Sequence, residues 1–307
     1  MEKQITDTVL MVEPVAFGYN DQTAVNNYFQ QNDQLSASDI QNLAYKEFTT
    51  MVKILRAHKV NVIVQKDSPL PVTPDSVFPN NWITFHEDGK IVIYPMFATN
   101  RRTERRKDII TKVIGNGFGM TELIDYSSYE NENIFLEGTG SMILDRENKI
   151  AYAALSERTN EQLFRKLCSK LGYIPVSFHA NQTVNGIRLP VYHTNVMLCA
   201  GDRFVVVCDE SIDDEEERKR VLGIFRSTSK EIISISEKQM HHFAGNMLQL
   251  VNTKNEKLLV MSQSSFEVLN TDQLASLSKY SQLVSIAVPT IEKYGGGSVR
   301  CMMVEVF

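Results

Sequence analysis

The sequence predicts an α/β fold in which one ββαβ unit is repeated five times around a common centre. Five segments share a pattern, in which a small or amide residue precedes a short apolar strand. Equivalent positions are nearly evenly spaced: Asn81 to Gly138 is 57 residues, Gly138 to Asn195 is 57, Asn195 to Asn246 is 51 and Asn246 to Arg300 is 54. Repeats of one size are typical of radial folds, in which each unit forms a small blade. Chance spacing within an ordinary α/β domain is the alternative interpretation.

The strands of each unit are predicted from short runs of apolar and β-branched residues. The expected first strands are residues 80–85, 137–144, 193–198, 245–250 and 297–304. Second strands are expected at residues 90–94, 150–155, 203–208 and 257–261. If the units are arranged radially, the starts of the first strands meet near the axis. Side chains far apart in the sequence would then share one central site.

Amphipathic or charged stretches after the second strands predict one helix in each of four units. These helices are expected at residues 101–114, 160–171, 213–226 and 271–280. Gly172 follows the second helix, and a glycine at this position commonly ends a helix. Thr271 is expected to cap the start of the fourth helix.

Two stretches break the regular pattern, and neither predicts a domain boundary. Residues 20–42 are rich in Asn, Gln, Asp and Ser, which indicates a surface loop and a candidate lid over a site. Residues 178–189 are expected to be polar, irregular and next to a pocket. Because no low-complexity linker occurs, residues 1–307 are expected to form a single domain.

The bulk composition indicates a globular protein and argues against several classes of function. The chain has 307 residues, of which 43% are hydrophobic, with a formal net charge of -5. This charge gives no broad attraction to nucleic acid or to an anionic membrane. No apolar run is long enough to span a bilayer, and residues 1–7 lack the order of a signal peptide. The four cysteines are scattered without metal-ligand spacing, so we expect no metal, no disulfide framework and a cytoplasmic location.

Cys301 is the candidate nucleophile. It follows the run Gly295-Gly296-Gly297-Ser298-Val299-Arg300, at the expected start of a strand. Glycines let the backbone approach a ligand closely, and a reactive thiolate needs such access. A small core residue is the alternative interpretation, as we expect for Cys199 and Cys208 in their apolar strands.

His193 and Glu137 are the other candidate catalytic residues. His193 stands at the start of the third unit, where an imidazole can deliver a proton to a leaving amine and later take one from water. Glu137 opens the second unit among apolar residues and glycines, where a carboxylate requires a partner. It can hold His193 in one tautomer or accept hydrogen bonds from substrate NH groups. A core histidine and an exposed strand-end glutamate are the alternatives.

Four motifs together resemble those of the pentein superfamily, which includes arginine deiminase, dimethylarginine dimethylaminohydrolase and glycine amidinotransferase. The motifs are Asn-Arg-Arg-Thr-Glu-Arg at 100–105, Phe-Leu-Glu-Gly-Thr-Gly at 135–140, His-Thr-Asn at 193–195 and Gly-Gly-Gly-Ser-Val-Arg-Cys at 295–301. Within the superfamily, the chain looks closest to the citrulline-utilisation hydrolases (citrulline ureidases). The resemblance implies a pseudo-symmetric five-bladed α/β-propeller, the pentein fold. It also implies a catalytic triad in which Cys301 is the nucleophile, His193 is the acid and base, and Glu137 is the third residue.

The expected reaction is hydrolysis of citrulline to ornithine, ammonia and carbon dioxide through an S-carbamoyl enzyme, without metal or organic cofactor. Arginine-processing relatives usually carry aspartates where this chain has Asn81 and Asn195. An amide offers both a donor and an acceptor, which suits a neutral ureido group better than paired carboxylates do. The expected substrate-binding residues are Asp75, Asn81, Arg101, Arg102, Arg158, Asn195, Asn246 and Ser298.

Several alternatives stay open at this stage. Arg101 and Arg102 are expected either to bind a substrate carboxylate or to begin a solvated helix. Arg158 is expected either to line the entrance of the active site or to belong to a turn that caps a helix. A deiminase or dihydrolase acting on arginine or a guanidino compound is the first rival function, and an amidinotransferase is the second. A non-catalytic propeller that binds a small molecule is the rival from another class. The expected partner is a small molecule, and a homodimer is compatible with the sequence.

Overall fold

The computed structural model describes residues 2–33 and 35–307, and its dominant feature is a three-stranded sheet that occurs five times. In each sheet the first two strands are antiparallel, and the second and third are parallel and joined through a helical connection. Four sheets follow one another along the chain. They are β3 (Ile83–Phe85), β4 (Lys90–Ile93) and β5 (Glu122–Asp125); β6 (Ile143–Asp145), β7 (Ile150–Ala154) and β8 (Ile174–Phe178); β11 (Leu198–Ala200), β12 (Phe204–Val207) and β13 (Glu231–Ser234); and β14 (Leu248–Val251), β15 (Lys257–Ser262) and β16 (Gln282–Ile286). The predicted ββαβ unit is therefore confirmed.

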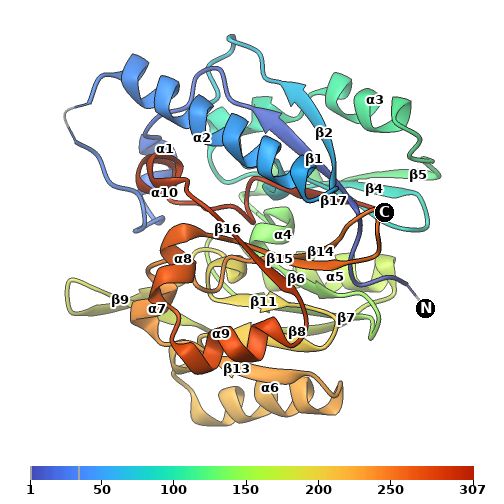
Figure 1. Cartoon of the computed structure of the whole chain (residues 1–307), viewed down its shortest axis with the longest axis vertical. Helices are drawn as coiled ribbons and strands as arrows, with labels where there is room; N and C mark the ends of the chain where they lie inside the picture. Colours follow the sequence, from blue (N-terminus) through green and yellow to red (C-terminus); the bar gives the residue numbers. More distant parts are fainter. Residues whose placement is uncertain (1, 34) are drawn as a thin grey trace.

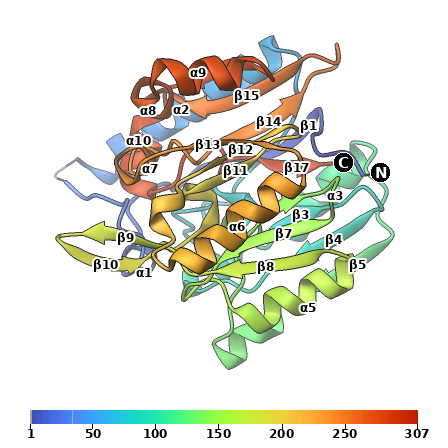
Figure 2. The ribbon, with the colours of Figure 1, turned by 90° about the horizontal axis from the view of Figure 1, so that it is seen from below.

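The fifth sheet combines the two ends of the described chain. Strand β17 (Val304–Val306) pairs antiparallel with β1 (Thr8–Glu13), and β1 pairs parallel with β2 (Asn61–Lys66). Both termini consequently lie on the same side of the molecule in two perpendicular views (Figures 1 and 2). This sheet repeats the order of the other four, with its first strand supplied from the far end of the sequence.

Helices connect the second and third strands and lie toward the outside of the molecule (Figure 1). The connecting helices are α2 (Ala37–Ala57), α3 (Lys107–Gly115), α5 (Glu161–Leu171), α6 (Glu215–Ser227), and α8 (Gln263–Val268) with α9 (Thr271–Ser278). Shorter helices are α1 (Asp21–Ala24), α4 (Gly138–Ser141), α7 (Glu237–Met240) and α10 (Pro289–Gly295). Five 3₁₀ turns are η1 (Pro79–Asn81), η2 (Thr99–Glu104), η3 (Ser127–Glu132), η4 (Thr194–Val196) and η5 (Asp209–Ser211).

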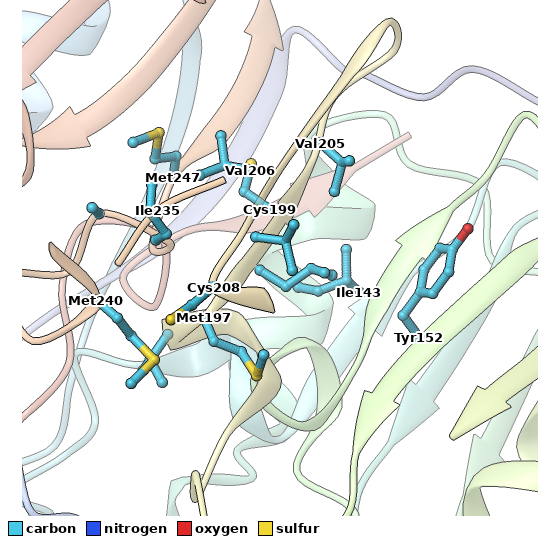
Figure 3. Packing of buried hydrophobic residues seen from close by; sticks show 14 of the residues in the cluster. Ile143, Tyr152, Met197, Cys199, Val205, Val206, Cys208, Ile235, Met240 and Met247 are labelled. Atoms are coloured by element: carbon cyan, nitrogen blue, oxygen red, sulfur yellow. The ribbon is translucent and has the colours of Figure 1, made fainter. Parts of the chain in front are cut away.

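The hydrophobic core lies between neighbouring sheets, because successive strand residues face opposite sides. Ile91 and Ile93 of β4 pack toward the sheet of β17, β1 and β2, whereas Val92 packs toward the sheet of β6, β7 and β8. Figure 3 shows the same alternation at β12, where Val205 and Val206 point to opposite sides. The apolar clusters join each sheet to the next, and the fifth sheet to the first.

Several sequence predictions of single elements need correction. The helix expected at 101–114 is split into η2 and α3, because Arg101 and Glu104 turn inward and are each only 2% exposed. Asn270, and not Thr271, caps α9: its side chain accepts a hydrogen bond from the backbone N–H of Gln273, 2.9 Å away. The helix predicted after residue 160 is correct, and it ends at Gly172 with a φ of 74°.

The predicted first strands begin a few residues too early. A turn precedes each strand, so β3 starts at Ile83, β6 at Ile143 and β17 at Val304. Cys301 consequently lies in a turn before β17 and not at the start of the strand.

The two stretches read as irregular contain regular elements. Residues 178–189 overlap the hairpin of β9 (Asn181–Val184) and β10 (Ile187–Pro190), which projects from the body in Figure 2. Residues 20–42 include α1 and the start of α2, while position 34 lies outside the described residues. Within the described ranges, no helix combines the length and the apolar character needed to cross a membrane.

Candidate active site

The turns that precede the first strands meet around one small buried cavity. Its lining residues are Thr23, Asn27, Asp75, Phe78, Asn81, Arg101, Arg158, Tyr192, His193, Gly295, Gly297 and Cys301. The free volume inside is only about 10 Å³, enough for about one water molecule. Segments of the first, second, third and fifth units therefore contribute to one site, as expected from radial repetition.

His193 and Glu137 form a buried hydrogen-bonded pair. Nε2 of His193 lies 2.7 Å from Oε2 of Glu137, and the two residues are 2% and 0% exposed. The other carboxylate oxygen accepts a hydrogen bond of 2.9 Å from the backbone N–H of Phe97. Burial lowers the pKa of His193 to about 4, although Glu137 opposes this effect. Burial raises the pKa of Glu137, but the Arg158 charge and the His193 hydrogen bond outweigh it and lower that pKa to about 2.

The sulfur of Cys301 is held by two side-chain amides. Nδ2 of Asn195 and Nδ2 of Asn246 each lie 3.3 Å from Sγ. The Asn246 amide is oriented by two further bonds: Nδ2 donates to the carbonyl of Asn195, and Oδ1 accepts from the backbone N–H of Arg300. N–H donors fix the position of the sulfur and leave it free to attack a bound carbon, so this arrangement suits a nucleophile.

The other three cysteines have a different environment. Burial raises the pKa of Cys168, Cys199 and Cys208 to about 12, so these side chains stay thiols at neutral pH. Cys199 lies within β11 and Cys208 directly follows β12, in the apolar surroundings expected of them. Of the four cysteines, Cys301 is the one that lines the cavity.

Two buried acceptor oxygens in the site have no hydrogen-bond partner. They are Oδ1 of Asp75, in the cavity lining, and Oδ1 of Asn195, beside the Cys301 sulfur. The other Asp75 oxygen accepts from Asn20 at 2.7 Å and from Thr23 at 3.1 Å. Burial raises the pKa of Asp75. A ligand with N–H donors would satisfy both free oxygens, which are costly while unpaired.

Arg101 and Arg158 orient the polar groups around them. Nη1 of Arg101 donates to Oδ1 of Asn81 at 2.6 Å, and its Nε donates to Glu104 at 2.9 Å. Nε of Arg158 donates to Asn26 at 2.8 Å, and its Nη1 lies 3.6 Å from Glu137.

Gly140 allows α4 to approach both the first and the third units. A Cβ atom at this position would lie 2.5 Å from Nδ2 of Asn81 and 2.8 Å from Nδ1 of His193. Nδ2 of Asn81 is bonded to Asn80 and Nε2 of His193 to Glu137, so a side chain at position 140 would have to displace one of these bonded groups. The glycine of the Phe-Leu-Glu-Gly-Thr-Gly motif is therefore a packing requirement of the site.

The structure brings most of the predicted site residues together. Asp75, Asn81, Arg101, Arg158, His193 and Cys301 line the cavity, while Glu137, Asn195 and Asn246 contact its members. Arg102 does not line it, because its Nε donates to the carbonyl of Met96, 3.1 Å away. Ser298 also lies outside the lining, and its hydroxyl donates to Glu292 at 2.6 Å.

Sequence reasoning did not name the residues of the N-terminal polar stretch that line the cavity. Residues 20–31, named here the covering segment, contribute Thr23 and Asn27 to the lining. The backbone carbonyl of Thr23 accepts from Nη2 of Arg158 at 2.7 Å, and Nε2 of Gln30 donates to the carbonyl of Gly295 at 3.0 Å. The lid expected in this stretch was not assigned to particular side chains, although the polar spacing Asn20, Thr23 and Asn27 was visible.

No metal centre is apparent in the described residues, where no three His, Cys, Asp or Glu side chains gather as a metal site requires. A model of the family "N,N dimethylarginine dimethylhydrolase, eukaryotic" matches residues 13–307, nearly the whole chain. The chain belongs to this family. The dimethylarginine dimethylhydrolase family is part of the pentein superfamily, so the resemblance drawn from the motifs is confirmed.

Solved structures share the fold of this dimethylhydrolase-family chain at low sequence identity. ArgZ, an arginine dihydrolase of the ornithine-ammonia cycle in cyanobacteria, has a TM-score of 0.72 and 16% identity over 97% of this chain and 40% of ArgZ. AgrE in complex with L-arginine has a TM-score of 0.74 and 17% identity, over 98% of this chain and 40% of AgrE. The Pseudomonas aeruginosa dimethylarginine dimethylaminohydrolase, in complex with citrulline, has a TM-score of 0.67 and 15% identity over 99% and 100% of the two chains.

These similarities establish a mixed α/β fold of the pentein type. This chain spans about 40% of full-length ArgZ and corresponds to its N-terminal domain, which it matches over 97% of both chains. Among curated protein sequences, no match was found.

Proposed function

We propose that this protein is a cysteine-dependent hydrolase that cleaves C–N bonds of a ureido or guanidino compound. One observation carries the proposal: a cysteine sulfur held by two amides shares a cavity with His193, the partner of Glu137, and with the unpaired Oδ1 of Asp75. Such a reaction needs a nucleophile, a proton carrier and acceptors for the N–H groups of the substrate. Membership of a family named for hydrolysis of a methylated arginine supports the same class.

In the proposed first step, the Cys301 thiolate attacks the planar carbon of the ureido group. The tetrahedral oxyanion is stabilised by nearby N–H donors, for which the amides of Asn81 and Asn195 are candidates. Nε2 of His193 is bonded to Glu137, so Nδ1 is the nitrogen that takes up the proton given up by the Cys301 thiol. It protonates the departing amine, which leaves an S-carbamoyl enzyme. In the second step His193 takes a proton from water, which then releases carbamate and restores the thiol.

Citrulline is the first proposed substrate. Asn81 and Asn195 present amides where paired carboxylates would suit a cation, and an amide can bond either the oxygen or the N–H groups of a ureido group. The free Oδ1 of Asn195 and Nδ2 beside the Cys301 sulfur offer both functions within one side chain. A solved relative binds citrulline, which is consistent with this choice.

Arginine is the second proposed substrate, because the cavity also contains a carboxylate. Oδ1 of Asp75 is free, and a guanidinium cation would supply both its charge and its N–H donors. The structural similarity to an arginine dihydrolase and to an L-arginine complex favours the same choice. Amidinotransfer is the remaining enzymatic alternative. It differs in that an amine, and not water, accepts the amidino group from the cysteine.

We propose that Arg101 and Arg158 act on the substrate indirectly. Most of their N–H groups are engaged, by Glu104 and Asn81 for Arg101 and by Asn26 and the Thr23 carbonyl for Arg158. They hold Asn81 and Glu137 in place, so we do not assign them the substrate carboxylate. The covering segment must move to admit an amino acid, since the free volume accommodates about one water.

The same proposal extends to the architecture and location. The cyclic contacts between the five sheets support a five-bladed propeller that forms a single catalytic domain. All four cysteines are free, which supports a reducing, cytoplasmic location.

Incubation with citrulline, arginine and agmatine, with mass detection of products and of adducts on Cys301, tests the function. Ornithine from citrulline supports the first substrate, and ornithine or citrulline from arginine supports the second. Cys301→Ala should abolish turnover, while Cys199→Ala, at a buried cysteine in β11, should retain it. Full activity of Cys301→Ala, or no turnover of any of the three compounds, contradicts the proposal.

A further inference from the structure

A second cavity, larger than the catalytic one, lies beside it. Its volume is about 490 Å³, within the range of small-molecule sites. The ring of Phe29 lines this second cavity and packs 5.9 Å from the ring of Tyr192, which lines the catalytic cavity. The lining residues that bear on its chemistry are Tyr28, Phe29, Gln182, His241, Phe243 and Glu292. The catalytic proposal gives none of these side chains a role.

Glu292 is a buried carboxylate in this cavity without a cationic partner. It is 9% exposed and accepts hydrogen bonds from two hydroxyls, those of Ser264 at 2.9 Å and Ser298 at 2.6 Å. In residues 2–33 and 35–307, no Lys, Arg or His forms an ion pair with it, and the neighbouring Lys293 pairs with Asp33 instead. Burial raises the pKa of Glu292. A carboxylate buried without a countercharge is costly, and a bound cation would remove that cost.

Aromatic rings surround the same space. The rings of Phe29 and Phe243 lie 5.1 Å apart, and the imidazole of His241 lies 5.7 Å from Phe29. Tyr28 is part of the lining and is 36% exposed. Aromatic faces attract organic cations, most strongly where the contact is shielded from water.

Phe243 adopts an unusual backbone conformation in this wall. Its φ is 60°, in the left-handed region that bulky residues rarely occupy. Such strain is often retained where a side chain has to face a ligand. Its ring is consequently directed into the aromatic wall of the cavity.

Gln182 supplies an unsatisfied hydrogen-bonding group. It is 1% exposed, its Oε1 lies 3.2 Å from Nε2 of His241, and its Nε2 has no partner. A buried N–H without an acceptor costs free energy, whereas a ligand carboxylate would accept from it.

We propose that this cavity binds a small zwitterionic amino acid with a cationic side chain. The cationic end lies between the aromatic rings at Glu292, and the carboxylate accepts from Nε2 of Gln182. The side-chain cation, the carboxylate and the aliphatic chain match the Glu292 carboxylate, the free N–H of Gln182 and the aromatic walls of the cavity, and the second cation, the α-ammonium group, is left to solvent.

This second site has a direct connection to the nucleophile. Ser298 donates to Glu292, and the carbonyl of Ser298 accepts from the backbone N–H of Cys301 at 2.9 Å. The covering segment contributes Tyr28 and Phe29 to the second cavity and Thr23 and Asn27 to the catalytic cavity. An experiment must therefore distinguish binding at the two places.

Titration calorimetry of the full chain with L-lysine tests the proposal, because lysine has no guanidino or ureido carbon for Cys301 to attack. L-Norleucine, which lacks the side-chain ammonium, and cadaverine, which lacks the carboxylate, should each bind at least tenfold more weakly. Glu292→Gln and Gln182→Leu should each weaken lysine binding at least tenfold, whereas Asp75→Asn in the catalytic cavity should leave it unchanged.

Thermal unfolding controls for the fold of each variant. Gln182→Leu should unfold at the same or a higher temperature than the unchanged chain, because it removes a buried N–H that lacks an acceptor. If Glu292→Gln does not fold, Gln182→Leu and Tyr28→Ala carry the test. The proposal is overturned if lysine does not bind, if norleucine binds equally well, or if Asp75→Asn weakens lysine binding and the second-cavity variants do not.

Discussion

At the scale of single residues, the most informative feature is that neutral amides, and not a cation, donate to the Cys301 sulfur. Two amide groups donate to it, and no arginine or lysine side chain in the described residues does so. Many reactive cysteines use a nearby cation, whereas this site uses the orientation of Asn195 and Asn246. The reactivity of the sulfur should therefore depend on which end of each amide faces it.

Asn246→Asp should slow the reaction of Cys301 with iodoacetamide at least tenfold at pH 7. The substitution replaces an N–H donor 3.3 Å from Sγ by a carboxylate oxygen, which removes a hydrogen bond to the sulfur and places a negative charge beside it. Loss of a hydrogen bond to a charged group costs about 1.5–3 kcal/mol, or roughly a factor of ten or more. Mass spectrometry of the labelled cysteine measures the rate. Asn116→Asp, at an exposed position, is the control, and equal rates for the two variants would refute this role of Asn246.

His193 should make the protein less stable as the pH falls from about 6.5 to 4. Its pKa is about 4 when folded and returns toward 6.5 on unfolding, so the unfolded chain binds more protons in this window. The linked loss is about 3 kcal/mol when the whole window is crossed. Chemical denaturation at pH 7 and pH 5 should show a smaller difference for His193→Asn than for the unchanged chain. His242→Asn, at an exposed histidine, is the control, and an undiminished difference for His193→Asn would contradict the assignment.

The catalytic candidates were predictable from the sequence because each stands at a unit start. Equivalent positions in the repeat favoured a catalytic role for Cys301, His193 and Glu137. The structure brings these residues together. Arg102 could not be separated from Arg101 in this way, because neighbouring residues of one turn point in different directions. The roles of Thr23 and Asn27 depend on how the covering segment folds back over the site, which no local pattern specifies.

At the scale of elements, helix α4 shows how closely the units approach one another. Its first residue, Gly138, has a φ of 48°, and a Cβ there would lie 2.3 Å from the carbonyl oxygen of Asn80. Gly140, two residues later, meets the side chains of Asn81 and His193. One short helix thus sets the relative positions of three units.

Gly140→Ala should inactivate the enzyme, because the added methyl group displaces Asn81 or His193. The crowding should also destabilise the fold by about 1–3 kcal/mol. Gly223→Ala in α6 is the matched control: nothing lies within 4 Å of its added Cβ, and an alanine there should stabilise the helix by about 0.4–1 kcal/mol. Turnover assays and denaturant unfolding measure both effects. Wild-type turnover by Gly140→Ala would show that the close approach is not required.

The elements themselves were largely predictable, since period-two and amphipathic patterns are local. The errors lie where a tertiary contact overrides the local pattern. The predicted helix 101–114 breaks because the Arg101 guanidinium binds Glu104 and Asn81 inside the molecule. The hairpin of β9 and β10, by contrast, had a local signal that was overlooked, because Asn185-Gly186 between the strands is a common two-residue hairpin turn.

At the scale of the whole molecule, the fifth sheet joins the two ends of the described chain. The side chains of Val304 and Val306 in β17 are 2% and 6% exposed, and they pack with the first sheet. Burial of each contributes about 1.5–3 kcal/mol, a large part of the 5–15 kcal/mol that typically stabilises a domain. The closing strand therefore matters for stability although it carries no catalytic group.

Truncation after Met303 should lower the melting temperature strongly and abolish turnover, even though Cys301 is retained. A circular permutant, with the two ends linked by a flexible peptide and new ends at the exposed Asn185–Gly186 turn, should stay folded and active because it keeps β17. Thermal unfolding followed by circular dichroism compares the three proteins. A truncated chain as stable as the full one would show that closure contributes little.

The pairing of β1 with β17 also has a consequence for biosynthesis. The hydrogen bond from Thr6 to the carbonyl of Val306 spans 300 positions. At typical translation speeds of roughly 5–20 residues per second, β1 leaves the ribosome about 15–60 seconds before its partner strand. During that interval the edge of β1 that will receive β17 stays unpaired and is open to association with other chains. The nascent chain would thus stay exposed to such association until β17 has been synthesised.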